Sequence, residues 1–215
     1  MKSYRLAFAL SVIGLVMLAV GCSSNDNRTE PEKQAAASKK KAEPSLYSGE
    51  EAFNRMLGLA LKWAPDAEPA RVESVLNTEA TGQGGKSTVW RGYFVSPSRR
   101  STKTFVCSGS RLAGAPPYGV SPEGPEGAYN AQSAGLVFSH FLLKTDTDKA
   151  YEVAQQHGGD ALLKKDAQQP VTYVLLKDKN LNVPVWFVIY GASEKDRKGI
   201  GVINATTGDF VRAVK

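Results

Sequence analysis

The stretch VPVWFVIY, residues 183–190, decides how the folded part of this chain is interpreted. It contains only branched, aromatic and proline residues and lies between the turn-forming segments 177–182 and 193–198, so it predicts a β-strand. A second stretch, TVWRGYFV at residues 88–95, repeats the central Val-Trp pair and also lies between turns. The chain therefore has two predicted strands that share a central Val-Trp pair. The sequence around the first strand can be compared with the sequence around the second.

A helix is predicted before each of these strands. The first begins at residues 48–51, SGEE, which match a capping box, and its apolar residues recur at helical spacing until Pro65. The second begins at residues 145–148, TDTD, where the aspartates are explained by capping. Its apolar stripe runs over residues 150–157, and Gly158-Gly159 is predicted to close it.

Further strands follow each helix, and the two series are in step. Trp90 precedes Trp186 by 96 residues (186 minus 90), and Ala52 precedes Ala150 by 98 (150 minus 52). A near-constant spacing favours internal duplication. The fold class predicted is α+β, with two similar units, each a helix packed on a small antiparallel β-sheet. The predicted strands are 70–76, 88–95, 102–108, 171–176, 183–190, 199–204 and 209–214.

This pattern predicts a domain order for the folded part. Residues 48–109 form the first unit and residues 135–215 the second, with 135–143 as an extra strand that enters it. Between them, residues 110–134 are rich in proline and glycine and are interpreted as a linker or long loop.

The N-terminus has the order of an export signal. A short basic start is followed by 15 uncharged residues, 6–20, too few to span a bilayer comfortably as a permanent helix. The run ends Leu18-Ala19-Val20-Gly21-Cys22, which resembles the lipobox of bacterial lipoproteins, although Ala19 stands where that family usually has leucine. The resemblance implies that residues 1–21 are a cleaved signal peptide and that lipid attached to Cys22 holds the chain on a membrane.

Residues 22–47 are predicted to be a flexible tether, because they carry almost no large apolar side chains. Lys39-Lys40-Lys41 could contact anionic lipid head groups, although a solvated tether is the simpler interpretation. Ser23, and not aspartate, follows the cysteine. In a Gram-negative cell this resembles the sorting pattern of the outer membrane, with the protein facing the periplasm.

Charge and cysteine content exclude several function classes. The formal net charge of +6 falls to +4 once Lys2 and Arg5 leave with the signal, and the remaining basic residues are scattered. Nucleic-acid binding is therefore not expected, and export argues against it as well. Cys107 is the only cysteine after Cys22, so no intramolecular disulfide can form, and its apolar surroundings favour a buried structural thiol.

No catalytic, metal or cofactor site is assigned from the sequence. Residues 80–87, ATGQGGKS, resemble a phosphate loop, but a strand and not a helix follows, so a hairpin turn is predicted and nucleotide binding is not. The chain has two histidines. A metal site would need more histidine, cysteine or carboxylate ligands at close spacing, and the sequence shows none. His157 is assigned to capping or packing, and His140 is placed on a strand facing solvent.

The second unit resembles a PepSY-like domain. The residues that carry the resemblance are DKAYEVA at 148–154, PVWFV at 184–188 and VINATTGDFV at 202–211, and the first unit matches more weakly because it lacks the Thr-Gly hairpin. The resemblance implies small helix-on-sheet modules of exported proteins. Protein binding, including peptidase inhibition, has been suggested for such modules, and no shared catalytic residues are known.

The sequence therefore favours a non-enzymatic, membrane-anchored module that binds a protein or peptide. Tyr93 and Tyr190 are the candidate binding residues, since some aromatic side chains near Trp90 and Trp186 must lie on the outer face of a sheet. Two alternatives remain open: an envelope hydrolase with a site between the repeats, and a structural envelope lipoprotein.

Overall fold

The computed structural model describes residues 43–214, apart from the side chains of residues 131–133. The predicted signal peptide 1–21, Cys22 and most of the predicted tether lie outside the described residues. Within residues 43–214, no helix has the length and apolar character needed to cross a membrane.

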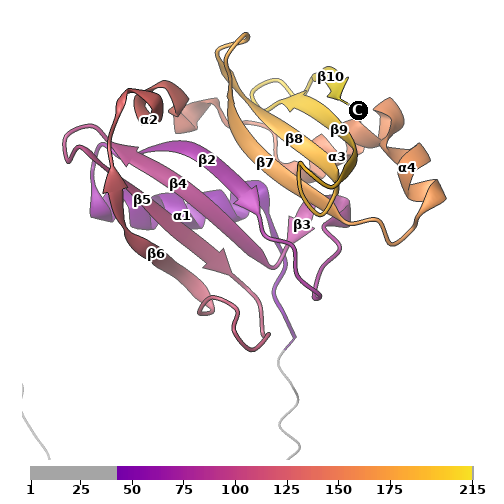
Figure 1. Cartoon of the computed structure of the whole chain (residues 1–215), viewed down its shortest axis with the longest axis horizontal. Coiled ribbons are helices and arrows are strands. Elements are labelled where there is room, and N and C mark those ends of the chain that lie inside the picture. The colour runs from indigo at the N-terminus through magenta and orange to yellow at the C-terminus, as the bar shows by residue number, and fades with distance from the viewer. Residues whose placement is uncertain (1–42, 215) are drawn as a thin grey trace, which may run out of the picture. The chain divides into compact units, whose positions relative to one another are not determined.

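The described elements comprise short helices and a series of antiparallel strands (Figure 1). The helices are α1 Gly49–Trp63, α2 Ala131–Leu136, α3 Thr147–Ala154 and α4 Asp160–Lys165, with a π-helical turn at Gln155–Gly159 and 3-10 turns at Gln83–Gly85 and His140–Leu142. The strands are β1 Tyr47–Ser48, β2 Glu68–Ser74, β3 Lys86–Ser87, β4 Val89–Ser96, β5 Ser101–Ser108, β6 Gly119–Ala128, β7 Val171–Asp178, β8 Val183–Gly191, β9 Arg197–Asn204 and β10 Phe210–Val214.

Eight of the strands form one sheet, in the order β10-β9-β8-β7-β2-β4-β5-β6. The mixed α+β class is as predicted, but the separate small sheets are not, because β2 pairs with β7 in the middle (Val72 opposite Leu175). Left apart, each of these strands would present a row of unpaired N–H and C=O groups. The pairing of β2 with β7 removes one free edge from each strand. It also places Val72 and Leu175 in the same core, where each is 0% exposed.

A helix followed by four strands occurs twice in the chain order. α1 precedes β2, β4, β5 and β6, and the α3–α4 segment precedes β7, β8, β9 and β10, so each series runs outward from the middle of the sheet. Two predicted boundaries were wrong. The segment 110–134 contains the edge strand β6, which tolerates Pro122 and Pro125 because one of its sides needs no partner. Residues 135–143 are not a strand but the end of α2, a loop and the 3-10 turn His140–Leu142, and Phe138 N–H donates to Pro69 O at 3.0 Å.

The two main helices start side by side. Ser48 caps α1 by accepting from Glu51 N, and Asp146 caps α3, as predicted. Asp146 Oδ1 accepts from Thr147 N at 2.6 Å and from Glu50 N at 2.8 Å, so one carboxylate serves both helix N-termini.

The two tryptophans are core anchors, as predicted. Trp90 and Trp186 are both 0% exposed, and their rings meet edge to face with centroids 6.4 Å apart. The Trp90 indole N–H donates to Tyr47 O at 3.0 Å, and the Trp186 indole N–H donates to Thr145 O at 2.8 Å. Tyr47 is therefore part of the core, and the folded part begins earlier than the predicted tether boundary at residue 47.

The glycine-rich segment 80–87 contains a turn, as predicted, which leads through β3 at its end into β4. Gly85 has φ +80°, and a Cβ there would lie 2.4 Å from the backbone nitrogen of Asp148. A Cβ on Gly82 would lie 1.7 Å from Val171 O. These glycines allow the turn to pack against the start of α3 and against β7, which explains the motif without a phosphate.

The sheet face opposite the helices has its own apolar cluster, centred on Val185, Val202 and Ile189. The Arg212 guanidinium on β10 contacts the Asp178 carboxylate on β7 at 2.7 Å, although β8 and β9 lie between these strands. A single side chain can bridge two intervening strands only if this half of the sheet curls around the cluster. The curl hides apolar side chains that a flat sheet would expose.

Candidate functional site

An interruption of the second helix creates the site. The helix that contains α3 is broken at Gly158-Gly159, as predicted, and a further helix, α4, follows from Asp160. At this break His157 has φ −104° and ψ 31°, and Gly158 has φ +109°, a conformation that favours glycine. The chain is therefore kinked between α3 and α4.

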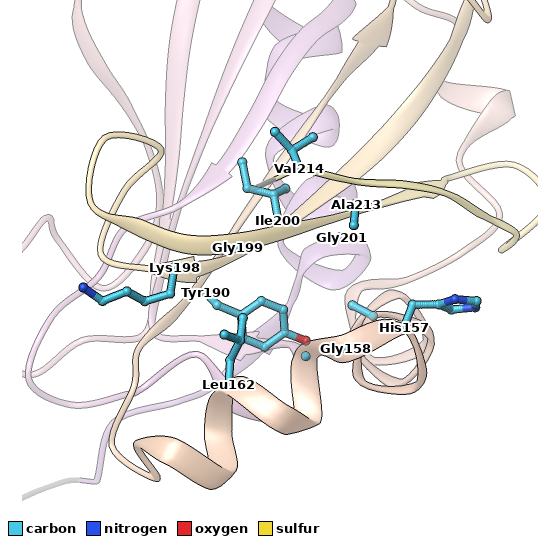
Figure 2. Close-up of a pocket in the computed structure, with 12 residues that line it drawn as sticks. His157, Gly158, Leu162, Tyr190, Lys198, Gly199, Ile200, Gly201, Ala213 and Val214 are labelled. Carbon is cyan, nitrogen blue, oxygen red and sulfur yellow. The ribbon is translucent and has the colours of Figure 1, made fainter.

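A cleft of about 300 Å³ lies between this interrupted helix and the last three strands. Ala154, Gly158 and Leu162 line one side, and Gly201 and Ala213 line the other. Figure 2 shows Tyr190 and Leu162 in the space between α4 and the β9–β10 hairpin, with His157 and Lys198 at opposite sides. This volume is at the lower end of the range for ligand pockets.

The cleft is lined by a glycine at a position that holds an aromatic residue in the other half. On β5, Phe105 pairs with Gly92 and packs edge to face on Phe94 and Trp63, at 5.7 and 6.3 Å between ring centroids. On β9 the corresponding position, opposite Val188, is Gly201. A Cβ on Gly201 would lie 2.9 Å from the Cβ of Ala154. The first half therefore has an aromatic layer where the second half has α3 packed closely on the strand, next to the cleft.

Tyr190 provides a polar group inside this cleft. Its side chain is 2% exposed, and its hydroxyl accepts from Gln155 Nε2 at 2.8 Å. Burial, followed by the neighbouring Tyr151 phenol, raises the pKa of Tyr190 well above its ordinary value. The phenol therefore stays neutral, and its own hydrogen can be donated to a group that enters the cleft.

The free edge of the sheet lies beside the cleft. Among the described strands β10 pairs only with β9, and it ends the sheet order. Ala213 on this strand is exposed and also lines the cleft. Unpaired backbone groups and a small apolar cleft are thus adjacent, which is the arrangement that strand addition by a peptide requires.

Tyr93, the other sequence candidate, lies elsewhere. It is on β4, on the face opposite the helices, and its hydroxyl donates to Glu73 Oε1 at 3.2 Å. Burial raises the pKa of Tyr93. Glu73 also pairs with Arg71 at 2.7 Å and with Arg91 at 3.7 Å. The structure therefore does not bring Tyr93 and Tyr190 together, and Tyr93 belongs to a network of ion pairs already satisfied by its neighbours.

The remaining candidates are structural. Cys107 is buried, as predicted, and burial raises its thiol pKa to about 11, so the reactive thiolate is disfavoured at neutral pH. His157 stacks on Phe210 with centroids 3.8 Å apart, which confirms packing. The prediction for His140 was wrong, since it lies in a 3-10 turn against Phe141. In residues 43–214 no group of His, Cys, Asp or Glu side chains could hold a metal ion.

Sequence reasoning identified Tyr190 but missed Gln155 and Gly201. The signal for Gly201 was available in Gly199-Ile200-Gly201, because glycine inside a strand often marks a close approach or a gap. Gln155 offered no such signal, since a polar residue at the end of a surface helix is ordinary.

Comparison with known proteins gives little further guidance. No protein-family model matches this chain, and no curated protein matches it. It is similar in structure to the protein described as "a putative lipoprotein" from Clostridium difficile 630, with 11% sequence identity and a TM-score of 0.48 over 76% of this chain and 91% of that chain.

Proposed function

We propose that this chain is a lipid-anchored extracytoplasmic module that binds a protein or peptide. The lipobox-like residues 18–22 and the polar segment that follows support the anchor at Cys22. In a Gram-negative cell the protein would lie on the outer membrane and face the periplasm. The proposal assigns it a binding role and not a catalytic one.

We also propose that the folded part arose by duplication of a PepSY-like unit. The support is the recurrence of a helix and four strands on each side of the β2–β7 pair. The Trp90 and Trp186 indoles make equivalent bonds to backbone carbonyls 98 residues apart, at Tyr47 and Thr145 (145 minus 47). Equivalent contacts from equivalent positions are expected of two copies of one unit.

The observation that carries the binding role is the cleft beside the free edge of β10. An extended peptide could pair its backbone with β10 and place one apolar side chain against Gly201 and Leu162. Tyr190 could donate a hydrogen bond to a polar group of that peptide. The backbone contacts would supply affinity, and the cleft would select the side chain.

The two alternatives receive less support. The hydrolase hypothesis requires a site between the repeats, but all of the described residues that line this cleft come from the second half. The cleft lining, taken over the described residues, also includes no serine, cysteine or carboxylate that could act as nucleophile or base. The structural-lipoprotein alternative has no described feature that favours it over binding.

Random-peptide display against residues 22–215 tests the proposal. The selected peptides should carry an apolar residue within an extended segment, and their binding should slow hydrogen exchange in β10. Ala213→Phe should weaken binding at least about tenfold, equivalent to about 1.4 kcal/mol, because it fills the cleft from an exposed position. The matched control is Ala161→Phe on α4, which is also exposed and does not line the cleft.

Two results would refute the binding site. The first is failure to select any peptide that binds the unmodified chain. The second is selection of peptides whose affinity is the same for Ala213→Phe and for the control, since such peptides would bind another surface.

A further inference from the structure

The loop between β5 and β6 presents an apolar surface to solvent. Its residues 111–118, RLAGAPPY, contain no acidic residue and a single charge, on Arg111. Leu112 is 38% exposed and Tyr118 is 50% exposed. Large apolar side chains collected in one exposed loop, rather than scattered, indicate a contact surface.

This loop lies where the chain enters the fold. Ser45 N donates to Gly109 O at 2.9 Å, at the first end of the loop, and the Ser45 hydroxyl lies 2.8 Å from the Tyr118 hydroxyl at its other end. The next residue, Leu46, is 48% exposed. Figure 1 shows the β5–β6 loop beside the beginning of the described chain, with the β7–β8 turn at the opposite end of the molecule.

The same surface carries positive charge. The Arg111 guanidinium lies 3.8 Å above the centroid of the Tyr118 ring, which supports both side chains at the surface. Lys86, which is exposed, is paired with Ser48 through the short β1–β3 ladder beside it. In the sequence, Lys39-Lys40-Lys41 precede the entry point. Tyrosine, leucine and basic side chains together are typical of surfaces that lie at a membrane interface.

We propose that Leu46, Arg111, Leu112 and Tyr118, the anchor-side surface, rest on the anionic bilayer that holds the Cys22 lipid. This inference depends on the anchor of the proposed function but not on its peptide site. The basic side chains contact lipid phosphates, and the leucines and the tyrosine enter the head-group region. The module is then oriented with the anchor-side surface toward the membrane.

Because the proposed tether keeps the module close to the membrane, a weak contact between the anchor-side surface and the bilayer is enough to orient the module. Ser45 follows Cys22 by 23 residues (45 minus 22), and a chain of that length with the flexibility predicted from the sequence would span roughly 25–30 Å on average. Such a chain holds the surface near the bilayer at an effective concentration on the order of millimolar. Two leucines, a tyrosine and an arginine can therefore bind reversibly, although they could not recruit a free protein.

Site-specific fluorescence in vesicles tests this orientation. The lipidated mature chain carries Leu112→Cys or, as the matched control, Leu181→Cys on the β7–β8 turn, where the leucine is 44% exposed. Lipid occupies Cys22, and Cys107 is 1% exposed, so a nitrobenzoxadiazole label attaches only at the new cysteine. The vesicles contain phosphatidylcholine and phosphatidylglycerol, with or without a doxyl-labelled lipid as quencher.

The label at position 112 should shift to shorter wavelength and be quenched several-fold more by the doxyl lipid than the label at position 181. Adding Arg111→Glu should reduce the quenching at position 112 in anionic vesicles. Equal quenching at both positions would overturn the orientation, and a shift at position 112 without quenching would indicate contact with a second copy of the chain. If the chain did not float with the vesicles, the anchor itself would be refuted.

Discussion

At the scale of single residues, Asp178 shows how a buried carboxylate ties the end of one strand to the edge of the sheet. Its Oδ1 accepts from Asn180 N at 2.9 Å and from Leu181 N at 3.1 Å, and its Oδ2 accepts from Arg212 at 2.7 Å. The bond from Arg212, together with the two backbone bonds, lowers the Asp178 pKa below its ordinary value of 3.8 despite burial. The ionised form is therefore stabilised only in the folded protein.

This linkage predicts an acid-sensitive contribution to stability. A lowered folded-state pKa contributes stability that is complete above the unfolded value, 3.8, and is lost as pH falls through the lowered value. Arg212→Met should reduce the free energy of unfolding by about 1 kcal/mol at neutral pH, with the difference shrinking in acid. Denaturant titration across pH measures it. Lys164→Met, which breaks the exposed pair with Asp160, is the control and should change stability little at any pH.

At the scale of elements, the break between α3 and α4 at Gly158-Gly159 is the feature on which the cleft depends. Gly159 lies directly against the phenol, since a Cβ there would be 1.8 Å from the Tyr190 hydroxyl. Gly158 faces open space but has φ +109°. Glycine is therefore required at position 159 for steric reasons and at position 158 for its backbone conformation.

Substitution by alanine should separate these reasons. Gly158→Ala should destabilise the protein by about 1–2 kcal/mol through backbone strain, while leaving Tyr190 in place. Gly159→Ala should destabilise the protein more. It should also displace the Tyr190 ring, because the added Cβ would overlap the Tyr190 hydroxyl and lie 2.9 Å from the Ala154 carbonyl oxygen. Thermal unfolding and tyrosine fluorescence or NMR measure both effects. An unchanged Tyr190 environment in Gly159→Ala would show that the turn does not position the phenol.

Local patterns predicted the elements better than they predicted the assembly. The strand around Trp186 and the cap at Asp146 follow from residues that are adjacent in the chain, so their sequence signals are complete. Strand β6 was missed because Pro122 and Pro125 mark a loop unless the strand is known to lie at an edge. The β2–β7 pair depends on contacts about 100 residues apart, and no local pattern encodes it. The cleft likewise depends on Gly201 lying against the helix that contains Ala154, a long-range contact that the local sequence does not encode.

At the scale of the whole molecule, the two halves share one core. Tyr173 on β7 packs against Trp90 on β4, with ring centroids 6.0 Å apart, and Tyr173 OH donates to Gly82 O at 2.6 Å. Asp146 of the second half caps the helix of the first. Separating the halves would expose these aromatic side chains and leave buried polar groups unpaired.

The shared core predicts unfolding in a single step. Tryptophan fluorescence and far-ultraviolet circular dichroism should give coincident denaturation curves. Val72→Ala in β2 and Leu175→Ala in β7 should each lower the common midpoint, at a cost of about 1–3 and 2–5 kcal/mol respectively. Two resolved transitions, with each substitution shifting only one, would show that the halves are independent domains.

Where the chain enters the fold also determines how the protein bears mechanical load. A pull on the proposed lipid anchor would reach Ser45 first and then the two-residue strand Tyr47–Ser48, whose antiparallel pairing with β3 can be opened one bond at a time. The next resistance is the Tyr47 carbonyl, held by the buried Trp90 indole. Tension would therefore be taken up at the central tryptophan layer before it reached α1, and the distant β10 edge would keep its shape while the membrane moved.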